Sequence, residues 1–420
     1  MARRLTVTDG YALINAMADE MYGANSTIQA IDGSTFASVG ERVMQAGTEN
    51  VINTLTLVSS RDLIAIRPHK AKFLLINSLD SGMFSNRIRK ISYYEKKATP
   101  TGASNTQLYT NLQEGFDNET NPSGGTPQST ESQWLQSAPV TYQAWFGGAI
   151  EWQYPYTLYE NALKQAFNSP EAWVQFLNGF LVSCANDIET EKEAFSRLTV
   201  LNAIAGVIDL SASMPGSAIN LTAEYNAKFQ TTYTTTQLLT TYFSEFLAFF
   251  VSTFKTVSDK LTERSILYHW SPAKTVNGVA HVLPRQTEKA DQRCMMVSEF
   301  WNDAEAYVLP QIFNDQYLKL ENFEKVNYWQ NINDPFAISF TPSIPNVSNP
   351  DAQTTGNPVT VSKVLGILYD RDAIMVDFHL EDVSSTTKEA RKHYRTVWNT
   401  INKNPLTDFT ENIVVFYMTD

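Results

Sequence analysis

Residues 169–202 constrain the fold more than any other stretch, because they carry an uninterrupted helical pattern. Ser169 can cap the helix, Pro170 suits the first turn, and Glu171 puts negative charge at the positive end of the helix dipole. Apolar residues then recur at helical spacing, at Trp173, Phe176, Leu177, Phe180, Cys184, Ile188, Phe195 and Leu198. A helix of about 50 Å is longer than usual in a globular protein. The pattern therefore predicts a spine helix with a sheet packed along it.

The two halves of this spine differ in polarity. The first half is apolar, and we expect a core formed by Trp173, Phe176, Leu177 and Phe180. The second half carries carboxylates at every other position between residues 187 and 193, and we expect an exposed acidic surface made of Asp187, Glu189, Glu191 and Glu193.

Composition bounds the class of protein. The chain has 420 residues, enough for two or three domains, and only 18% of them are charged, which is low for a globular protein. Tyr, Phe and Trp are plentiful, with 19, 23 and 8 copies, and such a composition favours extensive, weakly charged contact surfaces. The net charge of −12 argues against a protein that grips nucleic acid.

Two cysteines and the terminal region indicate the cellular context. Cys184 and Cys294 lie in apolar helical patterns, and we expect buried free thiols rather than a disulfide or a zinc site. The first ten residues lack the apolar core of a signal peptide, and the longest apolar run, 246–251, is too short to span a bilayer. We therefore expect an intracellular product that is soluble or assembled, with no membrane partner.

Ahead of the spine, the sequence predicts an arm and a long hairpin. Residues 1–60 combine a weak helix at 11–21 with polar, glycine-dotted stretches such as 33–40, as in an arm laid across another surface. Residues 86–97 are basic and β-prone, whereas 98–133 lack core residues and cannot fold alone. Residues 150–156 alternate apolar and polar and predict the strand that returns from this polar tip.

Beyond the spine, the pattern changes to mixed helix and strand. We expect helices at 236–261 and 288–304, and short strands at 265–270, 325–329 and 337–340. The last part predicts strands at 364–369 and 374–380 around a turn at 370–373, then strands at 393–400 and 412–418 joined across Asn404 and Pro405.

A search for chemistry finds little. No nucleotide-binding, metalloprotease or nucleophile-elbow motif is present, and we expect neither a catalytic residue nor a cofactor. Asp377, His379 and Glu381 alternate along one strand and imitate a metal site, although a solvated strand face explains them better. A basic run could contact phosphate, but the solvated face of a hairpin explains it better. It consists of Arg391, Lys392, His393 and Arg395.

Taken in order, these segments resemble a known family. An arm, a hairpin with a polar tip, a spine helix and a mixed insertion precede VLGILYDRDAIMV, HYRTVWNT and FTENIVVFYM. This order is similar to the major capsid proteins of tailed double-stranded DNA phages, which have the HK-97-like α+β fold, and most of all to those of small short-tailed phi-29-like phages. The resemblance implies an N-terminal arm at 1–83, an E-loop hairpin at 84–156, a P-domain spine at 157–205, an A-domain at 206–389 and returning P-domain strands at 390–420.

The same resemblance implies a structural function. Copies would form pentamers and hexamers of an icosahedral virion shell that is assembled in the host cytoplasm and encloses DNA without sequence-specific binding, with portal and scaffolding or accessory proteins as further partners. The E-loop would reach over a neighbouring subunit, so that its basic residues meet the acidic spine, and the tip at Asn404 and Pro405 would meet other capsomers. The basic residues are Arg87, Arg89, Lys90, Lys96 and Lys97.

Two alternatives stay open at this point. The many Trp and Tyr residues and the low charge would also suit a carbohydrate-binding or hydrolytic protein, but a sugar-binding β-sandwich has no place for so long a helix. Another virion component, such as a collar or tail protein, is the second alternative.

Overall fold

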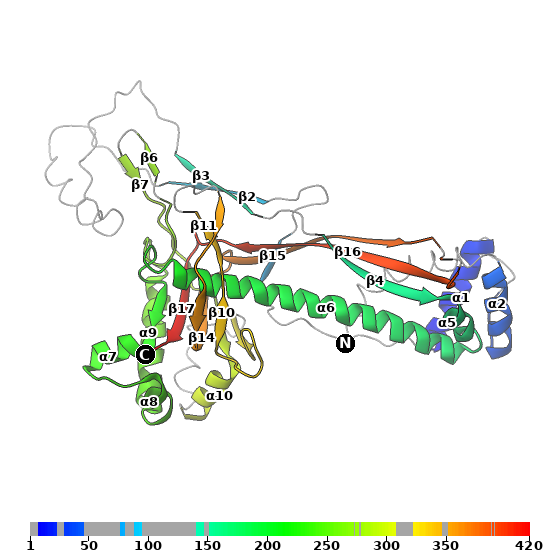
Figure 1. Ribbon diagram of the computed structural model, residues 1–420, viewed down its shortest axis with the longest axis horizontal. Coiled ribbons are helices and arrows are strands. Elements are labelled where there is room, and N and C mark those ends of the chain that lie inside the picture. Colours follow the sequence, from blue (N-terminus) through cyan, green and yellow to red (C-terminus); the bar gives the residue numbers. More distant parts are fainter. Residues whose placement is uncertain are drawn as a thin grey trace, which may run out of the picture. The chain divides into compact units, whose positions relative to one another are not determined.

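The long helix predicted from residue 169 onward is present as α6 (Pro170–Asp209), a helix of 40 residues that runs further than its sequence pattern indicated (Figure 1). Its start is as predicted, because the Ser169 hydroxyl accepts a hydrogen bond of 3.1 Å from the Ala172 amide. The computed structural model describes residues 7–22, 29–45, 76–79, 88–94, 140–146, 151–272, 274–276, 279–307, 322–346, 352–387, 389 and 391–420.

The chain separates into two units. The first comprises Met1–Lys72, Ala149–Phe195 and Phe378–Lys403, and the second comprises Phe73–Gly148, Ser196–Asp377 and Asn404–Asp420. Each unit is therefore assembled from three separate segments of the sequence.

The first unit is built on the apolar half of α6. Helices α1 (Val7–Tyr22), α2 (Gly33–Gln45) and α5 (Glu160–Ala166) share a core with it, in which Trp173 and Leu177 are buried. Trp173 stacks on Phe167 with ring centroids 4.4 Å apart, and Phe176 and Phe180 continue the row at one-turn spacing. The predicted core residues of the spine thus lie at this core, Trp173 and Leu177 fully buried and Phe176 and Phe180 half-buried.

A strand pair completes that unit. Strand β4 (Glu151–Tyr159) pairs antiparallel with β16 (Tyr394–Thr407), from Tyr159 opposite Tyr394 to Glu151 opposite Asn402. The alternating stretch at 150–156 is therefore a strand, as predicted, but its partner is this late strand and not the basic segment at 86–97.

The second unit is organised on a five-stranded sheet in the order β5–β17–β14–β8–β9. Its central strands β14 (Lys363–Asp370) and β17 (Ile413–Met418) are antiparallel and buried on both faces, at the places where the sequence predicted strands. The other strands are β5 (Ala218–Asn220), β8 (Gln292–Val297) and β9 (Phe323–Val326). Strand β1 (Asn77–Leu79) runs parallel to the beginning of β15 (Ile374–Ser385) in the same unit.

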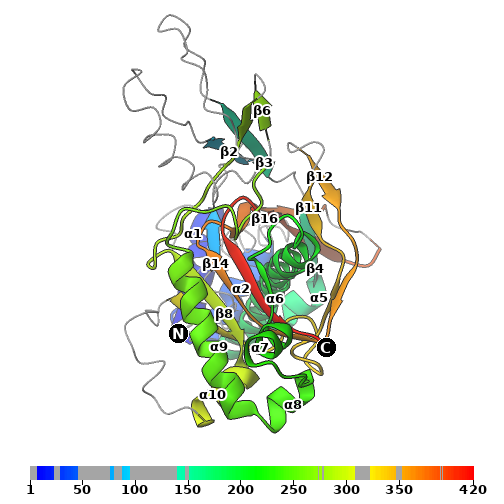
Figure 2. The same cartoon turned by 90° about the vertical axis from the view of Figure 1, so that its left-hand side faces the viewer.

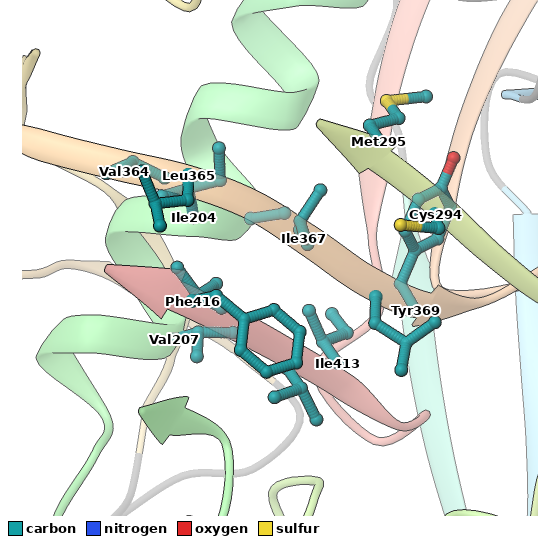
Figure 3. Close-up of a cluster of buried hydrophobic side chains, with 14 of the residues drawn as sticks. Ile204, Val207, Cys294, Met295, Val364, Leu365, Ile367, Tyr369, Ile413 and Phe416 are labelled. Atoms are coloured by element: carbon teal, nitrogen blue, oxygen red, sulfur yellow. The ribbon is translucent and has the colours of Figure 1, made fainter. Parts of the chain in front are cut away.

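Helices close this core around the sheet. Ile204 and Val207 of α6 join the side chains of β8, β14 and β17 in one apolar cluster (Figure 3). Helix α9 (Phe243–Lys260) adds an aromatic face, with Phe250 and Phe254 against Phe416 at centroid distances of 5.8 and 5.5 Å. Helices α7 (Leu221–Phe229), α8 (Thr235–Thr240) and α10 (Ser298–Tyr307) complete the helices of this unit (Figure 2).

A basic hairpin strand was correctly predicted at residues 86–97, where β2 (Ile88–Tyr93) lies. It pairs antiparallel with β3 (Thr141–Phe146), and we call these two strands the β2–β3 hairpin. Figures 1 and 2 show it beside the small antiparallel pair β6 (Lys274–Val276) and β7 (Val279–His281). The polar tip predicted at 98–133 lies outside the described residues.

Four local predictions were wrong. Residues 33–45 form a helix where a polar, glycine-dotted stretch of the arm was expected. Residues 265–270 form no strand, and the strand β8 occupies the first part of the predicted helix 288–304. The predicted helix 236–261 is divided into α8 and α9 around Tyr242.

Smaller strands complete the second unit. Strand β10 (Ile338–Phe340) pairs with β13 (Val359–Val361), and β11 (Ser343–Pro345) pairs with β12 (Gln353–Thr355). Across the described part of the chain, no helix is both long and apolar enough to cross a membrane.

Candidate assembly surfaces

The β2–β3 hairpin has two chemically different faces, because successive side chains of a strand point in opposite directions. One face packs on the core of the second unit through Tyr142, Ala144 and Phe146 of β3, which are at most 6% exposed. Lys90 and Ser92 of β2 belong to this inner face.

Four charged side chains meet on the inner face, and we call them the charge cluster: Lys90, Arg285, Asp408 and Glu411. The Lys90 amine donates hydrogen bonds to Asp408 Oδ2 and Glu411 Oε1. The Arg285 guanidinium lies 3.4 Å from Glu411 Oε1 and donates to Ser92 Oγ at 2.7 Å and to the Thr410 carbonyl at 3.1 Å. Two cations thus face two carboxylates, and the Asp408 side chain is only 2% exposed.

The protonation of the cluster follows from its burial and its pairing. Desolvation by burial raises the pKa of Glu411, against the pull of Lys90 and Arg285. The carboxylates of Asp408 and Glu411 raise the pKa of Lys90, although burial alone would lower it. The raised pKa of Lys90 keeps its amine protonated at neutral pH.

The outer face of the hairpin exposes large side chains. Ile91 is 42% exposed, Tyr93 65% and Trp145 48%. Arg89 lies directly opposite Trp145 in the register, with its guanidinium carbon 5.7 Å from the ring centroid. This face, formed by Arg89, Ile91, Tyr93 and Trp145, is apolar with one positive charge, and such faces are typical of protein interfaces.

The predicted basic residues of the hairpin therefore divide. Arg89 belongs to the outer face and Lys90 is paired within its own chain. Arg87, Lys96 and Lys97 lie outside the described residues. The contact of these residues with a neighbouring subunit stays a prediction.

The acidic half of α6 is less uniform than predicted. Asp187 and Glu191 are exposed and Glu193 is half-buried, but Glu189 is only 7% exposed. The expectation of an exposed carboxylate at every second position was wrong for Glu189, because alternate residues of a helix lie on different faces and one of them turns toward the protein.

A buried lysine lies close to these acids. Lys403 of β16 has a side chain that is 1% exposed, with its amine over the rings of Trp152, Tyr154 and Phe195 at 4.8, 5.2 and 5.9 Å. The amine donates to Tyr154 Oη and lies 3.8 Å from Glu191 Oε2. Desolvation by burial lowers the pKa of Lys403, while Glu191 opposes that shift.

The predicted tip at Asn404 and Pro405 has no turn. Strand β16 continues through both residues as far as Thr407, so the predicted junction between two strands was wrong. Asn404 is buried and donates to Asp377 Oδ2 at 3.1 Å, whereas Pro405 is exposed. A role of this place in contacts between capsomers is untested.

The two patterns that imitated chemistry have structural explanations. Asp377 is fully buried and accepts from Asn404, so it is not on a solvated face, and the side chains of His379 and Glu381 lie outside the described ones. Among the side chains that the structure describes, no group of three His, Cys, Asp or Glu residues could hold a metal ion. In the basic run, Arg391, Lys392 and His393 are exposed, but Arg395 is buried.

The remaining titratable groups of interest are buried inside the units. Cys184 and Cys294 are free and buried, as predicted, and burial raises the pKa of both thiols, to about 12 for Cys184. His269 is fully buried, and its ring nitrogens contact the Leu283 carbonyl at 2.6 Å and Asn412 Oδ1 at 3.2 Å. Burial lowers the pKa of His269 to about 4, so the ring is neutral at pH 7.

Sequence reasoning missed Arg285, Asp408, Glu411 and Lys403. Asp408 and Glu411 stand in the turn before β17, a place where carboxylates are ordinarily solvated, and no pattern links them to Lys90 more than 300 residues earlier. Lys403 carried one weak signal in the sequence. It lies two residues after the apolar Ile401 and therefore shares a face of the strand with that buried residue.

Comparison with known proteins agrees with this architecture. Residues 93–417 match the family described as Phi29-like phage major capsid protein. No curated protein matches the chain in sequence. The solved structure described as the capsid structure of Staphylococcus phage Andhra is similar over 84% of this chain and 87% of that chain, with a TM-score of 0.51 and 9% identity.

A second similar structure, described as that of head fiber and inner core protein gp22 of native bacteriophage P68, covers 84% of this chain and 89% of that chain, with a TM-score of 0.49 and 10% identity. The likeness to the Andhra capsid shows a shared fold of mixed helix and sheet. The family match spans most of the chain and includes strand β3 of the hairpin, the spine helix α6 and the strands from β14 onward. The chain belongs to the Phi29-like phage major capsid protein family and is a structural subunit of a phage capsid.

Proposed function

We propose that copies of this subunit form the pentamers and hexamers of an icosahedral shell around double-stranded DNA. The family match over residues 93–417 carries this proposal. The net charge of −12 supports it, because an acidic wall does not grip the DNA that it encloses. Portal and scaffolding or accessory virion proteins are the further partners in this proposal, and assembly would take place in the host cytoplasm.

The parts of the chain take the places that the HK-97-like fold gives them. In this proposal the β2–β3 hairpin is the base of the E-loop and α6 is the spine of the P-domain. Residues 206–389, with helices α7 to α10 and strands β5, β8, β9 and β14, are the A-domain, and β17 of residues 390–420 joins their sheet. Residues 1–83 form the N-terminal arm, and residues 390–420 return to the P-domain.

Docking between subunits would use the outer face of the hairpin. Arg89 would meet the exposed acids Asp187 and Glu191 of a neighbouring α6, while Ile91, Tyr93 and Trp145 supply apolar contact. Arg87, Lys96, Lys97 and Glu193 complete the two surfaces first expected from the sequence, whereas Glu189 is buried within its own chain. Pro405 is exposed at the place proposed for contacts between capsomers.

The test is electron microscopy of the purified protein in negative stain, over a range of concentrations. Closed shells or five- and six-membered rings are the expected result. A particle that stays monomeric, or one that forms only open tubes or a single collar-like ring, would contradict the proposal and favour another virion component. The carbohydrate-binding or hydrolytic alternative is not favoured, because the family match is to capsid proteins.

A further inference from the structure

The charge cluster joins elements that are distant in the sequence. Lys90 and Ser92 come from the hairpin, whereas Arg285, Asp408 and Glu411 come from the body of the second unit. The two hairpin residues are separated by one position, so they point to the same face of β2 and contact the cluster together.

The body side of the cluster is itself held in place. Asp408 Oδ1 accepts from the Thr410 amide at 2.9 Å and from the Thr410 hydroxyl at 2.7 Å, while the Asp408 amide donates to the Ala373 carbonyl at 2.8 Å. The Phe409 carbonyl accepts from the Trp270 amide at 2.7 Å. Lys90 therefore enters a carboxylate pair that the turn before β17 has already positioned.

Two kinds of contact hold the hairpin, and only one specifies its position. The apolar residues of β3 decide which face of the hairpin points inward, but a shift by two residues would keep that face inward and retain much of their burial. The hydrogen bonds of Lys90 and Ser92 have defined partners, and the same shift would break them. It would also move Arg89 and its neighbours along the outer face.

We propose that the charge cluster is a positioning lock, which holds the hairpin in one register on its own subunit so that Arg89, Ile91, Tyr93 and Trp145 face a second copy of this chain. The partner is a second copy because the family builds shells from this subunit, and because the acidic surface of the chain complements Arg89. This inference rests on the proposed docking of the hairpin. Lys90, Arg285, Asp408 and Glu411 are thus positioning residues.

The lock can be tested in the isolated subunit, without any assembly. A nitroxide label on Gln143→Cys, an exposed position of β3, reports the motion of the hairpin, and Cys184 and Cys294 are buried and hence protected from the reagent. In the otherwise unchanged protein, we expect an immobilised spectrum. Lys90→Met leaves the buried Asp408 and the half-buried Glu411 with one cation, so we expect both a lower melting temperature and a mobile label.

The decisive variant is Lys90→Met combined with Glu411→Gln. It removes one positive and one negative charge, so the cluster stays neutral and the melting temperature should recover. We still expect a mobile label, and we expect the concentration needed for shell assembly to rise by about tenfold or more. Lys90→Arg retains the charge and should keep the label immobile.

The matched control is Lys289→Met with Asp259→Asn, which neutralises an exposed ion pair of 2.7 Å in the same unit. It should change neither the label nor assembly. The lock is refuted if the label is mobile in the unchanged protein, or if it stays immobile in the Lys90→Met and Glu411→Gln variant. A mobile label with unchanged assembly would refute the positioning role.

Failure of the docking proposal gives a different result. Tyr93→Ser and Trp145→Ser alter the outer face and leave the charge cluster intact, and Ile332→Ser, at an exposed site of 69%, is their control. If both outer-face variants assemble like the control, the docking proposal fails. The mobility of the label in the Lys90 variants then still decides whether the lock exists.

Discussion

Lys403 and Trp152 form a buried cation–π pair in which the lysine amine lies 4.8 Å from the ring centroid. Trp152 is itself 46% exposed, so it covers the amine on the solvent side of β4. The aliphatic part of Lys403 fills the space between the strand pair and α6, where an apolar side chain would also fit.

Lys403→Met should be no less stable than the unchanged protein at neutral pH. Burial lowers the pKa of Lys403, so the charged amine is less favoured in the folded than in the unfolded state, and folding gains stability as pH rises toward the unfolded pKa. Met removes that penalty, and Glu191, with 49% of its side chain exposed, keeps its solvation. Lys403→Ala leaves a cavity and should be about 2–5 kcal/mol less stable than the Met variant. Denaturant unfolding of the three proteins measures both differences; a Met variant as unstable as the Ala variant would show that the charge itself stabilises the fold.

Leu177→Ala should destabilise the first unit by about 2–5 kcal/mol, because it removes a buried side chain from the start of the spine. Leu177 is 2% exposed, whereas Phe180 is half-buried, so Phe180→Ala should have the smaller effect per atom removed. Gln175→Ala, exposed on the same helix, should change stability by less than about 0.5 kcal/mol. Thermal unfolding compares them, and equal melting temperatures for the Leu177 and Gln175 variants would contradict the packing of the helix.

Two glycines of α6 should respond to alanine in opposite ways. A Cβ at Gly179 would meet no atom within 4 Å, so Gly179→Ala should stabilise the helix by about 0.5–1 kcal/mol. A Cβ at Gly206 would collide with the Phe409 ring and touch Ile344, so Gly206→Ala should destabilise the core despite the better helix propensity. The pair is its own control, since the substitution is the same. Stabilisation by Gly206→Ala would mean that the Phe409 ring moves away freely.

The neutral, buried His269 should make the second unit sensitive to acid. Its pKa is lowered from the ordinary 6.5 to about 4, so the folded state binds a proton less readily than the unfolded state. The free energy of unfolding is therefore unaffected by His269 above pH 6.5 and decreases by about 3 kcal/mol as the pH falls toward 4. Burial raises the pKa values of Glu411 and Asp370, so these groups act with the opposite sign. His269→Gln should therefore show a smaller loss of stability between pH 6.5 and 4 than the unchanged protein. Parallel pH profiles of the two proteins would contradict the assignment, since all other groups are common to both.

Charge reversal tests the proposed contact between the hairpin and the spine. Arg89→Glu, and separately Asp187→Lys with Glu191→Lys, should each weaken assembly and make it more sensitive to salt, and the combination should recover at least part of it. One exposed pair contributes only about 0.2–1 kcal/mol, but the contact is repeated in every capsomer. Lys260→Glu, at an exposed position of α9, is the control for a change in net charge. A combined variant that assembles no better than the worse single arm would show that the two surfaces do not meet.

Prediction from the sequence succeeded where one element carried its own pattern. The spine has a cap at Ser169 and apolar residues at helical spacing, and β14 and β17 are continuous apolar runs bounded by turn residues. The start of the spine and both ends of each strand were therefore found within one residue, whereas the spine continues beyond the predicted residue 202 to Asp209. Prediction failed where one local pattern suits both a helix and a strand. Residues 294–297 form a short apolar run that suits a helix or a buried strand, and their place between β14 and β9 makes them part of a strand.

The sequence by itself determined the spine helix, the strands β14 and β17, the buried thiols and the family resemblance, because each depends on residues that are near in the chain or on composition. Only the tertiary structure decided which side chains of an element face inward. Arg89 and Lys90 are equivalent in a strand pattern. In the structure Lys90 faces inward and meets Asp408 and Glu411, which come from the other end of the chain, while Arg89 lies outside. The same reason separates Glu189 from Glu191 and Asn404 from Pro405: adjacent or alternate residues acquire opposite surroundings, and the partners that decide between them come from distant segments.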